Sequence, residues 1–352
     1  MGNEEEQRAG LLRRLLAHAW RAGAEPTDLS SEELTSVVPY LHGSGAAGLA
    51  WWRVKHTPLA DLPVARDLRD AYRLQWIRNS AREQEIHEVV NLLRSQGVEP
   101  ILVKGWAAAR AYGDPGLRPY GDIDLLVPRE QRARAEKLVE GRDRVDFDHF
   151  ELDIRNSAEI EAIYVRSQLV DDIRIMAWED HLALLCLHFL KHGAWRPLWL
   201  CDIAAALEAQ PGGLDWHEFL SRENKWGQAI QCCVTLAREF LGARVVAPAG
   251  LPSWFIPAVT RAWSRALYTE RPLPEAIAAS WLRLPQSLRH RWPDPISATL
   301  YTGAPFNSVP RVVFQVGYYG VLAQRYLKRL CARAGADSAA TLGATGARST
   351  RR

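Results

Sequence analysis

The chain has 352 residues, of which 47% are hydrophobic and 24% are charged, and its formal net charge is +3 at pH 7. These proportions are ordinary for a soluble globular protein, and so small a charge does not by itself argue for nucleic acid as a partner. No apolar run reaches the ~18–20 residues of a membrane span, and the acidic N-terminus is unlike a signal peptide. We therefore expect a cytoplasmic protein of two domains or one elaborated domain.

The cysteines are odd in number and lack C-x-x-C spacing. They lie mostly in apolar, helical contexts, at positions Cys186, Cys201, Cys232, Cys233 and Cys331. This pattern predicts reduced core thiols rather than a disulfide framework or a zinc site.

The N-terminal part of the chain carries helical patterns. Residues 5–23 place several leucines on one side of a helix, and Ser30 with the acids after it predicts the start of another. A long pattern without Gly or Pro runs over residues 64–95, and Gly97 supplies its C-terminal cap. We expect residues 1–95 to form an N-terminal helical region.

A strand, a glycine turn, a short helix, a loop and a second strand are expected next. The strand covers residues 100–103 and the helix residues 106–112. The loop 113–121 is dense in Gly and Pro, which favour turns, and the second strand covers residues 122–127.

The second strand carries Asp122 and Asp124. Side chains at positions i and i+2 of a strand share a face, so these carboxylates repel each other unless a cation lies between them. Hard divalent cations such as Mg²⁺ take oxygen ligands and commonly bind between such carboxylates. Because residues 125–127 are apolar, we expect the strand to be buried and the acids to lie at its exposed end.

A third strand is expected after a charged helix over residues 129–140. Residues 145–154 alternate apolar and acidic side chains, which is the period of a strand. Asp146 and Asp148 share a face there. Next to the first acidic pair, this strand could complete a site of three carboxylates.

After about residue 158 the pattern is helical again, and the tail from residue 334 has the composition of a disordered segment. The helices are expected over residues 159–169, 179–192, 198–209, 215–221, 226–241 and 257–268. We therefore expect a core over residues 96–158, a C-terminal helical domain over 159–333 and a disordered tail over 334–352.

Two pairs of side chains in the C-terminal helices have alternative interpretations. His188 and His192 have the i, i+4 spacing of metal ligands on a helix, but no third ligand stands at the expected spacing, which favours packing or acceptor contact. Trp195 and Trp199 could stack on a nucleobase, although burial in a helical core is the default for tryptophan.

The pattern K-G-x-A-x-A followed by R-P-x-x-D-I-D-L-L-V resembles the DNA polymerase β-like nucleotidyltransferase superfamily. It is most similar to an uncharacterised bacterial nucleotidyltransferase family with an L-K-G segment before R-x-x-x-D-x-D-L-L-V. The similarity continues through residues 179–193 and 199–204 and covers about residues 85–245. It implies an α+β, mostly helical fold, in which N-terminal and C-terminal helical regions flank a nucleotidyltransferase core with a small mixed β-sheet.

The resemblance also implies a nucleotide site. Gly105, between Lys104 and Trp106, maps onto the turn that approaches the triphosphate, although the superfamily usually has Gly-Ser or Gly-Gly there. A glycine lets the backbone approach phosphates, and N–H groups at a helix start favour anions. Lys104 and Arg118 are candidate triphosphate contacts. The alternatives are a solvated Lys104 and a salt bridge from Arg118 to the acidic strand.

The metal ligands follow from the same resemblance. Asp122 and Asp124 map onto the metal-binding pair, and the third carboxylate is Asp146 or Asp148. With two bound Mg²⁺ or Mn²⁺ ions, Asp146, or Asp148 in its place, would also accept the proton of the acceptor hydroxyl. The catalytic residues expected are therefore Asp122, Asp124 and Asp146.

These features together predict an enzyme that moves a nucleoside monophosphate from a nucleoside triphosphate (NTP) to a hydroxyl or similar group of a small molecule or peptide. A role in natural-product biosynthesis would fit the resemblance. The alternatives are a non-catalytic relative that binds a nucleotide or a protein, and kinase-like phosphoryl transfer on the same metal site.

Overall fold

The computed structural model describes residues 2–147, 157–210, 212, 215–222, 226–246, 250–265 and 292–321. The chain divides into two compact units. The first consists of residues 1–273 and 305–308, and the second of residues 274–304 and 309–352. All residues of the predicted site belong to the first unit. The predicted division at residues 95, 158 and 333 stays a prediction.

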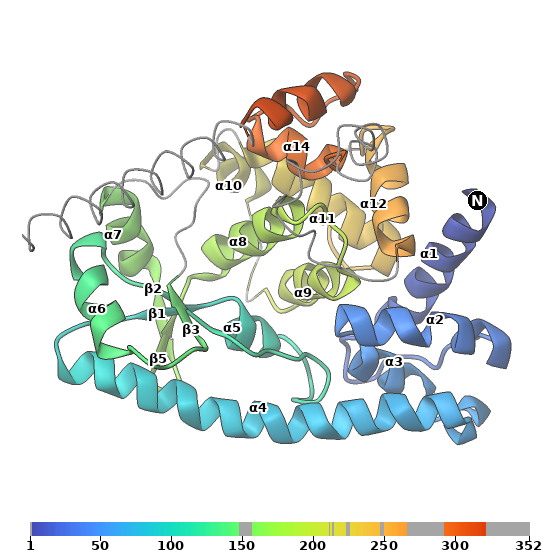
Figure 1. The fold of residues 1–352 in the computed structure, drawn as a ribbon, viewed down its shortest axis with the longest axis horizontal. Helices are drawn as coiled ribbons and strands as arrows, with labels where there is room; N and C mark the ends of the chain where they lie inside the picture. The colour runs from blue at the N-terminus through green and yellow to red at the C-terminus, as the bar shows by residue number, and fades with distance from the viewer. Residues whose placement is uncertain are drawn as a thin grey trace, which may run out of the picture. The chain divides into compact units, whose positions relative to one another are not determined.

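The first unit is mostly helical with one small sheet, as predicted (Figure 1). Its helices are α1 (Gly2–Leu16), α2 (Ser31–Ser44), α3 (Ala47–Val54), α4 (Pro63–Ser95), α5 (Gly105–Ala109), α6 (Arg132–Leu138), α7 (Ser157–Arg166), α8 (Trp178–Lys191), α9 (Pro197–Glu208), α10 (Trp216–Arg222), α11 (Gly227–Leu241) and α12 (Phe255–Ser264). Short 3₁₀ turns are η1 (Pro58–Asp61) and η2 (Arg129–Gln131). The strands are β1 (Ile101–Val103), β2 (Ile123–Leu126), β3 (Val145–Phe147), β4 (Gln168–Val170) and β5 (Ile173–Ile175).

The strands form one mixed sheet in the order β3-β2-β1-β5-β4. The central strand β1 is antiparallel to β2 and parallel to β5. β3 continues the sheet parallel to β2, and β4 pairs with β5 as an antiparallel hairpin. The predicted third strand therefore lies directly beside the acidic strand.

Each face of the sheet has its own apolar core. On one face Leu102, Ile123 and Leu125 pack with Ile86 and Leu93 of α4. On the other face the core is formed by a different set of side chains from β1, β2, α7 and α8, namely Ile101, Val103, Leu126, Ile163 and Leu184, together with Met176. Burying alternate residues on opposite faces fixes which way each strand residue points.

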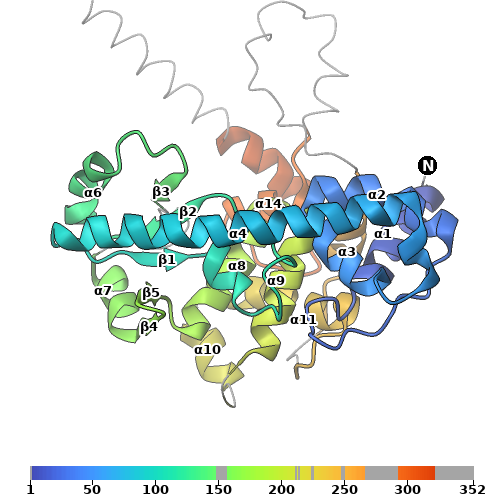
Figure 2. The ribbon, with the colours of Figure 1, turned by 90° about the horizontal axis from the view of Figure 1, so that it is seen from below.

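Helix α4 connects the N-terminal helices to the sheet (Figure 2). It spans Pro63–Ser95, close to the predicted 64–95, and Gly97 follows it with φ 72°. Proline fits the first position of a helix and glycine the left-handed residue after its end, which explains both boundaries. One end buries Leu68 near α3, and the other end buries Val89 under the sheet.

The first two helices begin and end for local reasons. Ser30 caps α2, and Glu33 returns a hydrogen bond to the Ser30 backbone, so the predicted start is confirmed. Helix α1 ends at Leu16 rather than at residue 23, because His18 has a left-handed backbone with φ 62°. The prediction for this helix was therefore too long.

Two other predictions around the core were also too long. The helix predicted over residues 106–112 is the five-residue α5, Gly105–Ala109. The helix predicted over residues 159–169 ends at Arg166, and the hairpin of β4 and β5 follows it. Asp171 and Asp172 turn this hairpin with φ 47° and 61°. Positive φ at both turn residues is typical of a type I′ turn, and no prediction was made for this hairpin.

Four cysteines lie in the described residues, and all four are buried and free, as predicted: Cys186, Cys201, Cys232 and Cys233. Cys331 and the predicted tail over 334–352 lie outside the described residues. Among the helices that the structure describes, none is long and apolar enough to cross a membrane.

The second unit is described over residues 292–304 and 309–321. It contains α14 (Pro295–Tyr301) and a helical stretch over 312–321. The rings of Tyr301 and Tyr318 stack with centroids 5.0 Å apart and hold the two together.

Candidate functional site

The three predicted catalytic carboxylates follow the register of the sheet. Asp124 of β2 lies opposite Val103 of β1 on one side and Asp146 of β3 on the other. Residues directly opposite each other in neighbouring strands share a face, so Asp124 and Asp146 point to the same side. Asp122 immediately precedes β2 and is exposed.

The acids lie at the open end of one face. Asp124 alternates with Leu126, whose side chain is buried with Leu184 of α8. The acids therefore lie on the same face of the sheet that α7 and α8 cover at Leu126, but nearer the start of β2. Asp122 and Asp146 are exposed and Asp124 is half-buried, as expected for the exposed end of a buried strand.

Lys104 supplies a positive charge to this face. Its Nζ lies 3.0 Å from Oδ1 of Asp124, and both side chains are mostly buried, with 16% and 18% of their surface exposed. The backbone of Lys104 has φ 55° and ψ −128°, a conformation that residues other than glycine rarely adopt. Lys104 is therefore not the solvated strand-end residue of the alternative interpretation.

The turn after Lys104 packs against the start of the acidic strand. A Cβ atom added to Gly105 would lie 3.4 Å from Cβ of Tyr120 and 3.5 Å from the carbonyl oxygen of Asp122. The side chain of Trp106 points into the core and donates a hydrogen bond of 3.3 Å from Nε1 to Glu83. For Trp106, only the main chain is thus in a position to serve the site.

Arg118 is held in a buried ion pair with Asp202 of α9. Its Nε and Nη2 donate to the two carboxylate oxygens over 3.0 and 2.7 Å, and its Nη1 donates to the Pro119 carbonyl over 2.9 Å. Tyr112 donates a hydrogen bond of 2.7 Å to the same carboxylate. Burial, together with the charge of Asp202, raises the pKa of Tyr112 well above its ordinary value.

Asp202 is thus the partner of Arg118, in place of a carboxylate of the acidic strand. The prediction that Arg118 contacts the triphosphate stays a prediction. Asp202 was not singled out from the sequence, although it lies within the resembling segment 199–204. Because Asp202 is far from Arg118 in the sequence, no local sequence pattern predicts that the two residues pair.

The loop between α5 and the acidic strand is held from α4 as well. Nδ2 of Asn79 donates to the carbonyl oxygens of Pro115 and Arg118 over 2.6 and 2.9 Å. Tyr120 donates in return to the carbonyl of Asn79 over 3.2 Å. The approach to Asp122 is therefore fixed from both α4 and α9.

Carboxylate oxygens are the ligands that Mg²⁺ and Mn²⁺ prefer, so the chemistry of the donors on this face fits a hard divalent cation. Within the described ranges no group of three or more His, Cys, Asp or Glu side chains is gathered closely enough to hold a metal ion. Asp148 lies outside the described residues. The ligand set Asp122, Asp124 and Asp146 or Asp148 stays a prediction.

Imidazole and indole rings gather where α8 leads into α9. The ring of Trp199 lies 4.5 Å from that of His188, 5.1 Å from that of His192 and 5.8 Å from that of Trp195 between centroids. The guanidinium of Arg196 lies 5.3 Å from the Trp199 ring. We call these five residues the ring cluster. The alternative of packing, rather than metal ligation, fits these contacts for the two histidines.

The ring cluster lies within electrostatic reach of Lys104. Burial and then the charge of Lys104 hold the pKa of His188 well below its ordinary value, with smaller contributions from His192, Lys191 and Arg118. The His188 imidazole is therefore neutral at pH 7.

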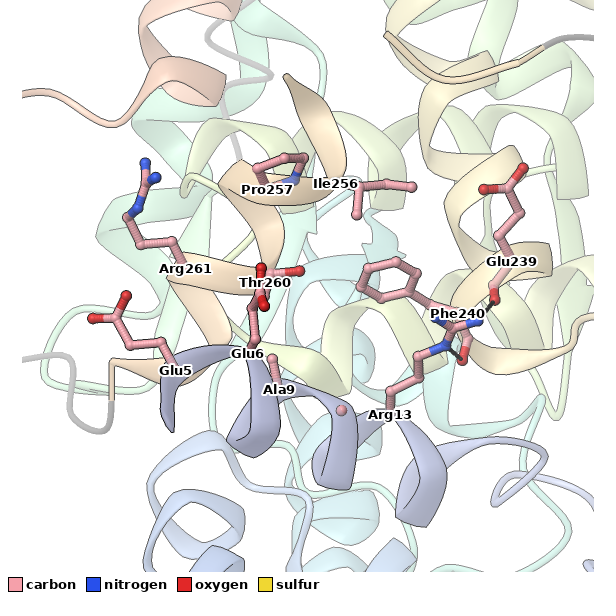
Figure 3. Close-up of a pocket in the computed structure, with 11 residues that line it drawn as sticks. Glu5, Glu6, Ala9, Arg13, Glu239, Phe240, Ile256, Pro257, Thr260 and Arg261 are labelled. Carbon is pink, nitrogen blue, oxygen red and sulfur yellow. Dashed lines mark hydrogen bonds between the residues drawn. The ribbon is translucent and has the colours of Figure 1, made fainter. Parts of the chain in front are cut away.

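A separate pocket of about 400 Å³ lies between α1, α11 and α12 (Figure 3). Glu5, Glu6 and Arg261 stand around it, and Arg13 lies over the ring of Phe240 with its guanidinium 4.9 Å from the ring centroid. None of the predicted site residues is among the described residues that line it. The pocket is therefore not the predicted nucleotide site.

Residues 30–144 and 148–242 match a protein family described as uncharacterised nucleotidyltransferase, which is more than half of the chain. The chain belongs to this nucleotidyltransferase family. The matched stretches of this chain include Lys104, Asp122, Asp124 and Asp202. Asp146 lies between the two matched stretches. No curated protein and no solved structure matches the chain.

Proposed function

We propose that this nucleotidyltransferase moves a nucleoside monophosphate from an NTP to a hydroxyl or similar group of a small molecule or peptide. The register of the sheet carries the proposal, because it sets Asp124 beside Asp146 on one face, with the Lys104 ammonium on Asp124. A role in natural-product biosynthesis would fit the resemblance to the bacterial nucleotidyltransferase family. A cytoplasmic location would suit the free thiols.

In the proposed reaction the acceptor oxygen attacks the α-phosphorus of the NTP. The bond between the α-phosphorus and the oxygen bridging to the β-phosphate breaks, and pyrophosphate leaves. Asp146 accepts the acceptor's hydroxyl proton. Asp122 and Asp124, with Asp146 or Asp148, would hold Mg²⁺ or Mn²⁺, which lowers the pKa of a bound hydroxyl and neutralises charge on phosphate oxygens.

Lys104 and Gly105 would bind the triphosphate. The backbone conformation of Lys104 brings its ammonium back over the acidic face, and Gly105 leaves the main-chain N–H groups of the turn unshielded by a Cβ. Because α5 is only five residues long, we ascribe phosphate binding to these groups rather than to a helix dipole. Arg118, paired with Asp202, would set the position of the loop that leads into Asp122.

A second candidate is a relative that binds a nucleotide without transferring it. It is favoured by the Lys104 ammonium already paired with Asp124, and by a Trp106 side chain that points into the core where the superfamily usually has serine or glycine. Kinase-like phosphoryl transfer on the same carboxylates is a third candidate.

The test uses NTPs labelled at the α- or the γ-phosphate and measures which label reaches an acceptor. The purified full chain is incubated with Mg²⁺, each of the four NTPs and pooled small-molecule and peptide acceptors. Transfer of label from the α-phosphate to an acceptor supports nucleotidyl transfer, and transfer from the γ-phosphate supports the kinase-like candidate. Binding of NTP in titration calorimetry without transfer of either label supports the binding relative.

Matched variants locate the site. Asp124→Asn should abolish transfer and weaken binding of Mn²⁺, measured by electron paramagnetic resonance. Asp143→Asn, at an exposed turn residue, should leave both unchanged. Unaltered Mn²⁺ binding and transfer in Asp124→Asn would show that the site has been placed wrongly.

A further inference from the structure

The ring cluster lies further along α8 from the part of the helix that packs on the sheet face carrying Asp124. Leu184, His188 and His192 follow one another at intervals of four residues, so they share one side of the helix. Leu184 is buried with Val103 and Leu126 on the face of the sheet that carries Asp124. His188 lies one turn further along α8 from Leu184. The effect of the Lys104 charge on His188 is consistent with this position.

The loop that carries the ring cluster is fixed in an unusual conformation. Gly193 and Ala194 both have left-handed backbones, with φ 70° and 57°. A non-glycine residue stays in this conformation only when its surroundings hold it there. Trp263 donates a hydrogen bond of 3.0 Å to the carbonyl of Ala194, and Arg196 donates one of 2.6 Å to the carbonyl of Ser44.

The chemistry of the ring cluster suits a flat, uncharged ring. His188 is neutral and His192 is exposed, while Trp195 and Trp199 are half-buried. The two tryptophans contribute partly exposed indole rings, and the cationic guanidinium of Arg196 lies beside Trp199. Nucleobases stack on such side chains because every base has a π-face. A phosphate group would have the Lys104 ammonium as a positive partner on the acidic face.

We propose that the ring cluster binds the base of the NTP whose phosphates lie at Lys104 and Gly105. The inference rests on the proposed function and names the substrate group that α8 and α9 recognise. Stacking distinguishes bases weakly, so the site accepts purine and pyrimidine NTPs with similar affinity. His192 and Trp195 are the residues through which the base enters.

The experiment separates the base from the phosphates. Dissociation constants for ATP and for inorganic tripolyphosphate are measured by titration calorimetry with Mg²⁺ on the full chain. His192→Ala and Trp195→Ala should weaken ATP binding roughly 5- to 150-fold, the effect of removing one stacking contact, and leave tripolyphosphate binding unchanged. His192→Phe, which keeps an aromatic ring, should retain most of the affinity for ATP.

Trp76→Ala on α4 is the matched control, since this tryptophan is 46% exposed and lies outside the ring cluster. It should bind both ligands like the wild type. Unchanged ATP affinity in both ring-cluster variants would overturn the proposal, and so would an equal loss for ATP and tripolyphosphate. A wild-type chain that binds neither ligand would instead overturn the proposed function, and the base site with it.

Discussion

His181 of α8 is half-buried, with its Nε2 atom inside the protein and within electrostatic reach of the Arg118–Asp202 pair. Its Nε2 has no hydrogen-bond partner among the described residues. Burial lowers the pKa of His181 to about 4, with Asp202 opposing the shift and Arg118 adding to it. The native protein therefore keeps His181 neutral at a pH where the unfolded chain protonates it.

This shift predicts a loss of stability in acid. Between pH 6.5 and 4 the unfolded state holds more protons at His181 than the native state, so the free energy of unfolding falls as the pH falls. From pH 7.5 to 5, the wild type should lose about 2 kcal/mol more than His181→Leu, at 1.36 kcal/mol per pH unit below the unfolded pKa. Urea unfolding at both pH values measures the difference. Identical losses in the two proteins would contradict the prediction.

The sequence predicted some residues of the site and not others for a physical reason. Asp122 and Asp124 stand two residues apart, and the period of a strand is enough to place them on one face. The partner of Arg118 is 84 residues away in the sequence, at Asp202. Only the packing of α9 against α5 brings it near, and no local pattern records that contact.

At the scale of elements, α3 and the loop 113–121 meet backbone to backbone. A Cβ atom on Gly48 would collide with the carbonyl oxygen of Gly116 and would lie 3.3 Å from Cα of Leu117. On its other side, Gly116 lies against the ring of Tyr72, where an added Cβ would come within 2.5 Å of a ring carbon. The loop that leads into the acids is thus enclosed between α3 and α4.

Gly48→Ala should therefore push the loop away from α3. We expect it to lower the free energy of unfolding by about 1–3 kcal/mol, as overpacking of a core does, and to weaken ATP binding. Gly10→Ala is the control, because its Cβ would meet nothing within 4 Å and alanine favours the helix. Thermal unfolding and calorimetry of both variants give the comparison, and a Gly48→Ala protein as stable as the Gly10→Ala protein would refute the contact.

Element prediction succeeded where the local signal was long. Helix α4 has 33 residues without an internal glycine or proline, so its helical pattern of apolar residues extends over many turns and predicts the helix clearly. The hairpin of β4 and β5 has only three residues in each strand, which is too few to show alternation. It gains its stability from pairing with β1, a contact that appears only in the folded sheet.

At the scale of the whole molecule, the first unit extends beyond the family match. The match begins at residue 30, yet α1 packs against α2, α11 and α12. Leu15 and Leu16 of α1 are completely buried. Helix α1 is therefore part of the core that supports the nucleotidyltransferase fold.

We predict that the first unit unfolds as one. Leu15→Ala should cost about 2–5 kcal/mol, the usual result of emptying a buried leucine site. Hydrogen exchange should show the amides of α1, α4 and β1 losing protection by similar amounts in this variant, while Glu4→Ala, at an exposed position, changes none of them. Loss of protection confined to α1 would show that it is an independent appendage.

Under the proposed function, the strained backbone of Lys104 is a stability cost carried by a residue that binds the nucleotide. A lysine held at φ 55° and ψ −128° costs on the order of 1–3 kcal/mol, and glycine would adopt the same conformation without strain. Lys104→Gly would relieve that cost but remove the ammonium from the acidic face. In the proposed function, Lys104→Gly would therefore lose the triphosphate contact together with the backbone strain and the ion pair to Asp124. Selection that includes nucleotide binding would keep the strained lysine.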